Sequence, residues 1–265
     1  MTIESVRDYA AMSSVGASII FDDVMRKISK GERYNLGLAT GNTMITLYDQ
    51  LAEKLNRAKA DLSLLSTWNL DEYSTDGKST VPHDHPLSYW KYMHEKLFSK
   101  FDPALGFNDA NAHFPEPASC GAYDPAIEAA GGLDLQLLGI GFNGHIAFNE
   151  PFTSLNSRTG VRALTEDTLI VNSRFFGNDV NKVPKTALSV GVGTVCDSKQ
   201  VMLLISGHNK ARALRHCVEG GVDHAWTISA LQLHKDGIIV CDEPACGELK
   251  VDTYKYFKEI YKNEK

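Results

Sequence analysis

The chain has 265 residues, of which 43% are hydrophobic, and a formal net charge of -6 at pH 7. This length and apolar content are enough for one sizeable core, and the acidic balance disfavours nonspecific binding to nucleic acid or anionic membranes, which needs clustered positive charge. The first residues lack the basic stretch and apolar run of a secretory signal, and no segment is long and apolar enough to span a bilayer, so we expect a cytoplasmic protein.

Hydrophobic periodicity predicts an amphipathic helix over about residues 3–30, ended by Gly31. An apolar run over 34–40 predicts a strand and a tight turn, and the spacing over 43–57 predicts the helix that follows. The same order recurs, with strand candidates at 62–73, 133–142, 199–208 and 236–244 and helix candidates at 85–100, 210–220 and 253–262. We therefore expect a single α/β domain over 1–265, with a mainly parallel, Rossmann-like sheet covered by helices on both faces.

Ligands of parallel sheets bind beyond the carboxyl ends of the strands, so the polar, glycine-rich loops there are the first place to look for a site. Thr40, Gly41, Asn42 and Thr43 form such a loop at the mouth of a predicted helix. Backbone N–H groups, the helix dipole and a hydroxyl would suit a phosphate there. The loop matches neither GxxxxGK[ST] nor GxGxxG, and a plain helix cap is the alternative interpretation.

Two cations can complete this phosphate site. Lys210 lies at a later junction between strand and helix, and apolar neighbours of Arg174 can bury its stem and aim its guanidinium for bidentate phosphate contact. A lysine at a helix start is more often simply solvated. The combination of the glycine-rich loop with both cations, rather than any one member, predicts a site for one phosphate.

Two acids, Asp71 and Glu72, end the apolar run over 62–73. Partial burial there would raise the basicity of a carboxylate. Successive side chains of a strand point to opposite faces, so we expect Asp71 to face the cleft and Glu72 to cap or pair elsewhere. The alternative is that both acids cap a turn.

The densest polar signal is GIGFNGHIAFNEP over 139–151, where three glycines free the backbone around Asn143, His145 and Glu150. His145 can act as an acid and base near neutral pH, and Glu150 can orient its ring. The alternative is a structural histidine, which the flanking glycines and the Asn-Glu-Pro downstream disfavour.

Patterns for metal or nucleophilic chemistry are missing from the sequence. HExxH and paired cysteine boxes are absent, so we expect no required metal, and the absence of GxSxG disfavours a serine nucleophile. Cys241 and Cys246 are near neighbours, but the four residues between them, including Pro244, fit neither CxxC nor a zinc knuckle. We expect all five cysteines to be reduced thiols.

These segments closely resemble the glucosamine-6-phosphate deaminase family, also called glucosamine-6-phosphate isomerase. The shared stretches run from about residue 35 to about residue 257, and GHIAFNEP, NSRFF and VGVGT are the most specific of them. The resemblance implies an enzyme that converts glucosamine 6-phosphate and water to fructose 6-phosphate and ammonia without a cofactor.

The resemblance also implies a role for each candidate residue. The position of Asp71 is that of the base that removes the C2 proton, giving an enolamine, and the position of His145 opens the pyranose ring with help from Asn143 and Glu150. Phosphate binding is implied for the positions of Gly41, Asn42, Thr43, Arg174 and Lys210.

Departures from the family pattern have consequences. Many members have aspartate where Asn143 stands, and because asparagine carries no charge, a charged relay to His145 must run through Glu150. Members activated by N-acetylglucosamine 6-phosphate carry a basic residue at the position of Gly160, so we expect this activation to be absent or weakened. The polar segment 164–183 is a candidate lid over the substrate.

Two other functions remain as alternatives. 6-Phosphogluconolactonase shares the general fold and a glycine-histidine turn, but its turn usually continues with Thr-Ala-Ser, and Glu150 would have little purpose in lactone hydrolysis. A sugar-phosphate sensor needs an attached DNA-binding segment, and no helix-turn-helix pattern precedes residue 30. We expect a small sugar phosphate as the partner rather than nucleic acid or membrane, and the sequence is compatible with a monomer or a symmetric homo-oligomer.

Overall fold

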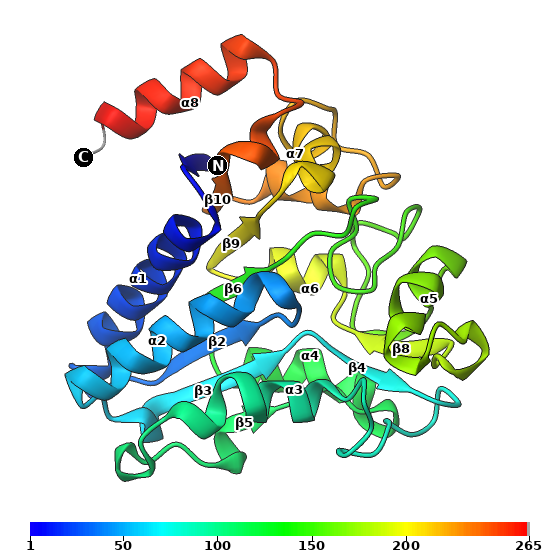
Figure 1. The fold of residues 1–265 in the computed structure, drawn as a ribbon. Coiled ribbons are helices and arrows are strands. Elements are labelled where there is room, and N and C mark those ends of the chain that lie inside the picture. The colour runs from blue at the N-terminus through cyan, green and yellow to red at the C-terminus, as the bar shows by residue number, and fades with distance from the viewer. Residues whose placement is uncertain (264–265) are drawn as a thin grey trace.

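The computed structural model describes residues 1–263, apart from the side chains of Phe175 and residues 261–263. Its main strands are β1 (Thr2–Val6), β2 (Tyr34–Leu38), β3 (Leu65–Asn69), β5 (Ala112–His113), β6 (Leu135–Leu138), β9 (Gln200–Ile205) and β10 (Gly237–Asp242). Within the described chain these form one sheet in the order β1-β10-β9-β6-β2-β3-β5, and every pairing in it is parallel (Figure 1).

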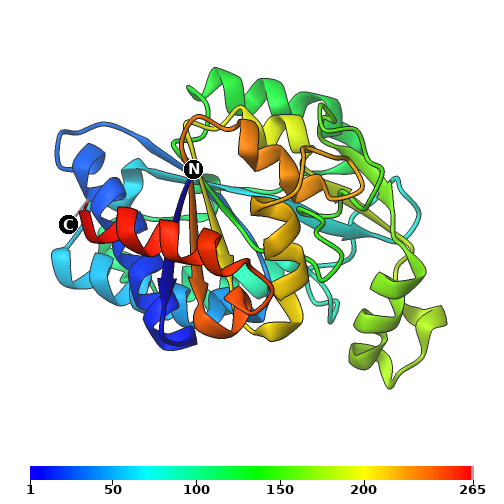
Figure 2. The same ribbon diagram turned by 90° about the horizontal axis from the view of Figure 1, so that it is seen from above.

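Helices cover both faces of this sheet. The helices of the described chain are α1 (Tyr9–Ile28), α2 (Ile45–Ala58), α3 (Tyr89–Lys96), α4 (Cys120–Ala129), α5 (Glu166–Ser173), α6 (Val192–Cys196), α7 (Ala211–Val218) and α8 (Val251–Asn263), and of these α5 lies away from the large sheet. α1, α2 and α3 lie on one face and α4 and α6 on the other (Figures 1 and 2). The central strands are buried along their whole length, as parallel strands between two helical layers must be. The predicted α/β architecture is confirmed, and none of the described helices is long and apolar enough to cross a bilayer.

The helix predicted over 3–30 was wrong at its start. Residues 2–6 form β1, which pairs with β10 in parallel, and Ile3 is buried in the core. The helix begins only after Asp8, whose carboxylate accepts a hydrogen bond from the N–H of Ala11. A five-residue edge strand is too short for its own period to stand out beside a twenty-residue helix.

The strand predicted over 62–73 is two strands in different sheets. β3 ends at Asn69, and after Leu70 the chain enters β4 (Asp71–Ser74). β4 pairs antiparallel with β8 (Thr186–Ser189), which also pairs antiparallel with β7 (Gly160–Ala163). This small sheet lies beyond the carboxyl edge of the large one, beside α5 (Figure 1). Asp71 therefore stands where the two sheets meet, and the candidate lid 164–183 connects β7 to β8.

Candidate active site

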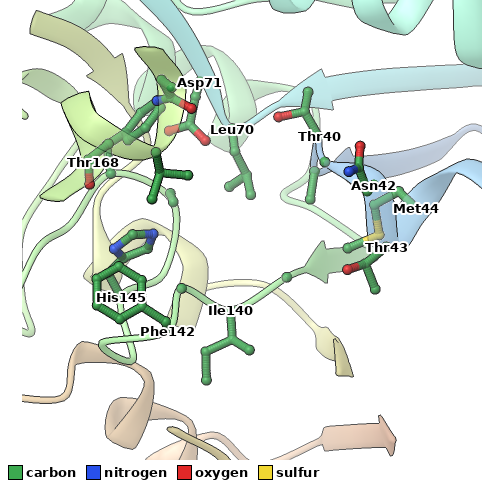
Figure 3. Close-up of a pocket in the computed structure, with 18 of the residues that line it drawn as sticks. Thr40, Asn42, Thr43, Met44, Leu70, Asp71, Ile140, Phe142, His145 and Thr168 are labelled. Atoms are coloured by element: carbon green, nitrogen blue, oxygen red, sulfur yellow. The ribbon is translucent and has the colours of Figure 1, made fainter. Parts of the chain in front are cut away.

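A cavity of about 620 Å³ opens where β2, β3, β6 and β9 end at their carboxyl edge. Seven of the nine candidate residues line it: Gly41, Asn42, Thr43, Asp71, His145, Arg174 and Lys210. In Figure 3, Asp71, Thr168 and His145 lie on one side of the opening, and Asn42 and Thr43 lie across from them. Asn143 and Glu150 are not in the cavity wall but lie behind His145.

Two glycine turns lie at the carboxyl ends of β2 and β9, beside the cavity. Gly41 and Gly207 have φ angles of 118° and 91°, which favour glycine, and each is followed by a 3-10 turn that opens a helix. The hydroxyl of Tyr92 donates to the carbonyl of Gly41 at 2.7 Å. The hydroxyl of Tyr9 donates to the carbonyl of Asn42 at 3.1 Å. Because the C=O and N–H of a trans peptide point opposite ways, an anion at the start of α2 meets N–H groups rather than carbonyl oxygens.

Two cations reach the same cavity from other elements. Lys210 ends the 3-10 turn η9 (His208–Lys210) after β9, and Arg174 follows the last residue of α5. Burial lowers the pKa of the Lys210 ammonium, because desolvation penalises its charge. A bound phosphate would offset that penalty. The predicted phosphate residues are thus brought to one place.

Asp71 is a buried carboxylate at the edge of the cavity, with 9% of its surface exposed. Its Oδ1 has no hydrogen-bond partner among the described residues. Burial raises the pKa of Asp71 to about 7, although the Ser189 hydroxyl and the Phe148 N–H act to lower it. A carboxylate with this pKa and a free oxygen is suited to accept a proton from carbon near neutral pH.

Glu72 points to the other side of the strand, as the alternation of β4 predicts. It accepts hydrogen bonds from the N–H groups of Tyr89 and Trp90, each at 2.9 Å, and from the Ser88 hydroxyl at 3.3 Å. These donors form the first turn of α3. Glu72 therefore caps a helix and fixes Tyr89, which lines the cavity.

His145 has its ring in the cavity wall and its Nδ1 against a carboxylate. Nδ1 lies 3.1 Å from Oε2 of Glu150, so we assign the proton to Nδ1, which leaves Nε2 as the acceptor. The ring also lies close to Gly141, where a Cβ would be 2.4 Å from Nε2. Glycine is needed at position 141 to make room for the imidazole.

Glu150 connects the histidine to the neighbouring segments. Its Oε2 accepts from Nδ2 of Asn143 at 2.8 Å, and its Oε1 accepts from the hydroxyls of Thr168 at 2.6 Å and Thr165 at 3.3 Å. Burial acts to raise the pKa of Glu150, but His145 and the other donors outweigh it and lower the pKa to about 2. Glu150 thus stays ionised at neutral pH, and the neutral Asn143 acts on His145 through it.

Sequence reasoning missed three residues of this site. Tyr89 lines the cavity, Thr168 both lines it and binds Glu150, and Ser189 lies beside Asp71. Thr168 had a signal, since it follows Thr165 at the spacing of a helix cap in the candidate lid. Ser189 had none, because only the register of β8 against β4 places it opposite Asp71.

Replacing Ser189 with alanine is expected to move the acid limb of the pH profile of kcat/KM upward by up to about one pH unit, because the pKa of Asp71 rises further without the nearby hydroxyl. The reason is that the hydroxyl stabilises the ionised form of Asp71. Ser189→Thr, which keeps a hydroxyl, should restore the limb. An unchanged profile in Ser189→Ala would show that the hydroxyl does not act on the titrating group.

Comparison with known proteins places this site in a family context. The family described as glucosamine-6-phosphate isomerases/6-phosphogluconolactonase matches residues 7–240. The glucosamine-6-phosphate deaminases of Porphyromonas gingivalis and Phocaeicola vulgatus are each 48% identical to this chain over 259 residues, covering 97% and 96% of both proteins. A monomeric glucosamine-6-phosphate deaminase superposes with a TM-score of 0.84 at 36% identity, covering 93% of this chain and 99% of its own. The 6-phosphogluconolactonase of Trypanosoma brucei reaches 0.74 at 16% identity, covering 94% of this chain and 98% of its own, which shows a common fold.

Proposed function

The chain belongs to the family of glucosamine-6-phosphate isomerases and 6-phosphogluconolactonases, and from that premise we propose that it is a glucosamine-6-phosphate deaminase. It takes glucosamine 6-phosphate and water to fructose 6-phosphate and ammonia. The observation that supports this choice best is the pairing of Asp71 with the His145 and Glu150 couple around one cavity. Lactone hydrolysis has no need of two such groups.

The first step is opening of the sugar ring. We assign it to His145, whose Nε2 accepts the proton from the O1 hydroxyl and returns it to O5. Glu150 holds Nδ1 and stabilises the imidazolium that forms in between. The phosphate, bound at Gly41, Asn42, Thr43, Arg174 and Lys210, fixes the far end of the sugar so that ring oxygen and imidazole stay in reach.

The second step moves hydrogen from C2 to C1. Asp71 takes the C2 proton of the open-chain aldehyde, giving an enolamine, and returns a proton to C1. The product is an imine at C2, which water hydrolyses to the ketone and ammonia. No electrons leave the substrate, so the chemistry needs only proton transfers at positioned side chains.

The test is a parallel assay of two substrates with purified protein. Glucosamine 6-phosphate should yield fructose 6-phosphate and ammonium in equal amounts, detected by coupled enzymes, whereas 6-phosphogluconolactone should yield no acid beyond its spontaneous hydrolysis. Acid release from the lactone without ammonium from the amino sugar would assign the chain to the other branch of the family. Binding of both sugars without turnover would indicate a sensor.

We expect activation by N-acetylglucosamine 6-phosphate to be absent or weakened. Gly160 offers no side-chain charge, Arg158 is paired with Asp197, and Arg162 donates to the Arg158 carbonyl at 2.6 Å. An anion would have to compete with these contacts. Initial rates at subsaturating substrate, with and without the acetylated sugar phosphate, check this, and strong activation would contradict it.

The segment 164–183 is the proposed lid. Its helix α5 touches the site at two points, since Thr168 donates to Glu150 at 2.6 Å and Asn172 donates to the Tyr73 hydroxyl at 2.7 Å. Because Arg174 lies at the end of this helix, phosphate binding should hold the segment closed. Limited proteolysis within 164–183 should slow several-fold when inorganic phosphate is added, and equal cleavage rates would exclude a lid.

We place the enzyme in the cytoplasm. All five cysteines are free thiols in the structure, and a reducing compartment keeps them so. Phosphorylated sugar is also a substrate of intracellular metabolism rather than of secreted enzymes. The cytoplasmic assignment therefore agrees with both the thiols and the proposed chemistry.

A further inference from the structure

Cys241 and Cys246 form a thiol pair beside the glycine turn that carries Lys210. Their Sγ atoms are 3.5 Å apart, although the residues are five positions apart in sequence. Cys241 lies in the last part of β10, and Cys246 ends the 3-10 turn η11 (Glu243–Cys246). Pro244 is the second residue of that turn, and the Ala245 N–H donates to Oδ1 of Asp242 at 3.0 Å, which folds the chain back. The turn, rather than a CxxC spacing, brings the sulfurs together.

The two thiols lie close enough to form a disulfide after a local rearrangement, and Cys246 is the more reactive of the two. A disulfide needs sulfurs about 2.05 Å apart, so side-chain rotation and a small closure of the turn would join them. The two thiols are hydrogen-bonded to each other, and this contact lowers the pKa of the Cys246 thiol although burial acts to raise it. Cys246 also keeps 8% of its surface exposed, whereas Cys241 keeps none. Cys246 is therefore the sulfur that a small oxidant meets first.

The backbone around the pair supports the turn that contains Lys210. Asp242, which lies between the two cysteines, accepts from the Ser206 hydroxyl at 2.5 Å and from the Gly207 N–H at 3.0 Å. Gly247, next to Cys246, lies so close to His208 that a Cβ would be 2.8 Å from its Nδ1. A closure of η11 onto β10 must therefore shift groups that position the start of η9.

We propose that Cys241 and Cys246 form a reversible disulfide that weakens phosphate binding at the Lys210 turn. The oxidant is a small-molecule disulfide. The Cys246 thiolate attacks one of its sulfurs and displaces one thiolate, and Cys241, giving up its proton, then attacks Sγ of Cys246 and displaces the second. The cysteine pair loses two electrons and two protons, and the small disulfide is reduced to two thiols. Formation of the disulfide does not depend on the proposed function. Its effect on phosphate binding does, because it presupposes the proposed phosphate site.

The experiment oxidises the full chain with excess oxidised glutathione and reads three quantities. Intact mass should fall by the mass of two hydrogen atoms, and peptide mapping should link Cys241 to Cys246. The dissociation constant for inorganic phosphate, measured by calorimetry, should rise on the order of fivefold, the lower end of couplings between sites. The KM for glucosamine 6-phosphate should rise with it, and dithiothreitol should reverse both changes.

Matched cysteine variants separate the outcomes. Cys246→Ser and Cys241→Ser should each lose the response, whereas Cys120→Ser, at a half-buried cysteine elsewhere, should keep it. A stable glutathione adduct in place of the linked peptide would overturn the disulfide, and a linked peptide with unchanged phosphate affinity would overturn its regulatory effect. Failure of the reduced protein to bind phosphate would instead count against the proposed function. The intact mass of the oxidised chain would still show whether the disulfide forms.

Discussion

Replacing Asp71 with asparagine should lower kcat/KM for glucosamine 6-phosphate on the order of 10³- to 10⁴-fold, the upper part of the range for loss of a general base. An amide cannot accept the C2 proton, whereas the volume of the side chain and the phosphate site are preserved. The dissociation constant for inorganic phosphate should therefore stay close to that of the native protein. Steady-state kinetics and calorimetry on one preparation measure both quantities.

The same substitution should stabilise the fold. The pKa of Asp71 is raised from 3.8 to about 7, so above pH 7 the folded state holds an ionised carboxylate that the unfolded state holds more easily. Removing it should raise the free energy of unfolding at pH 8 by up to roughly 4 kcal/mol, at about 1.4 kcal/mol per pH unit. The gain should shrink as pH falls from 7 towards 4, because the folded carboxyl then becomes protonated. Thermal melts at pH 8 and pH 5 report this difference.

Glu72→Gln is the matched control for both effects. Its amide nitrogen would face the N–H groups of Tyr89 or Trp90, and this cost opposes the gain from removing a carboxylate whose pKa burial raises, so the variant should melt no higher than the native protein while keeping measurable turnover. Asp71→Asn should thus lose turnover and gain stability, whereas Glu72→Gln should keep turnover and show no such gain in stability. Native turnover in Asp71→Asn would remove Asp71 from the mechanism.

Replacing His145 with glutamine should lower kcat on the order of 10²- to 10³-fold, the lower part of the range for loss of one acid and base group. Glutamine can donate to Glu150 but cannot carry the proton from O1 to O5. Because some open-chain sugar forms in solution without the enzyme, this loss should be smaller than that of Asp71→Asn. Initial rates at saturating substrate measure it.

Two further variants interpret the His145 result. Glu150→Gln keeps the ring but replaces the charge behind it, so it should lose less activity than His145→Gln. His216→Gln, at a ring stacked on Trp226 outside the cavity, should keep native rates. Equal losses in His145→Gln and His216→Gln would point to a general effect of histidine removal rather than to ring opening.

The positions of the main candidate residues could be predicted from general rules of strand geometry, whereas the residues that contact and orient them could not. Gly41 and Lys210 were placed by the rule that parallel strands present their carboxyl ends at one edge, and the structure puts both in one cavity wall. The direction of Asp71 followed from the period of a strand. Ser189 and Thr168 were out of reach, because their contacts depend on the register of the small sheet and on how α5 packs.

The errors have physical causes as well. The sequence predicts a helix over the residues of β1 because Ile3 also suits the helical period that follows. The spacing of Cys241 and Cys246 predicts no pairing, because rules such as CxxC describe sulfurs on one helical turn. In the structure, a turn that contains Pro244 brings the two positions together. Local patterns thus predicted the elements and the loops, and long-range pairing decided the rest.

The most direct test of Asp71 as the base is to run the reaction in D2O and measure deuterium at C1 of the fructose 6-phosphate formed. If Asp71 takes the C2 proton and returns one to C1, part of the fructose 6-phosphate formed by the native protein should carry deuterium at C1, visible by NMR together with ammonium, because the Asp71 carboxyl can exchange its proton with solvent before it returns one. Asp71→Asn should form this product on the order of 10³- to 10⁴-fold more slowly. Deuterated product formed by Asp71→Asn at the native rate would contradict the assignment of Asp71 as the base.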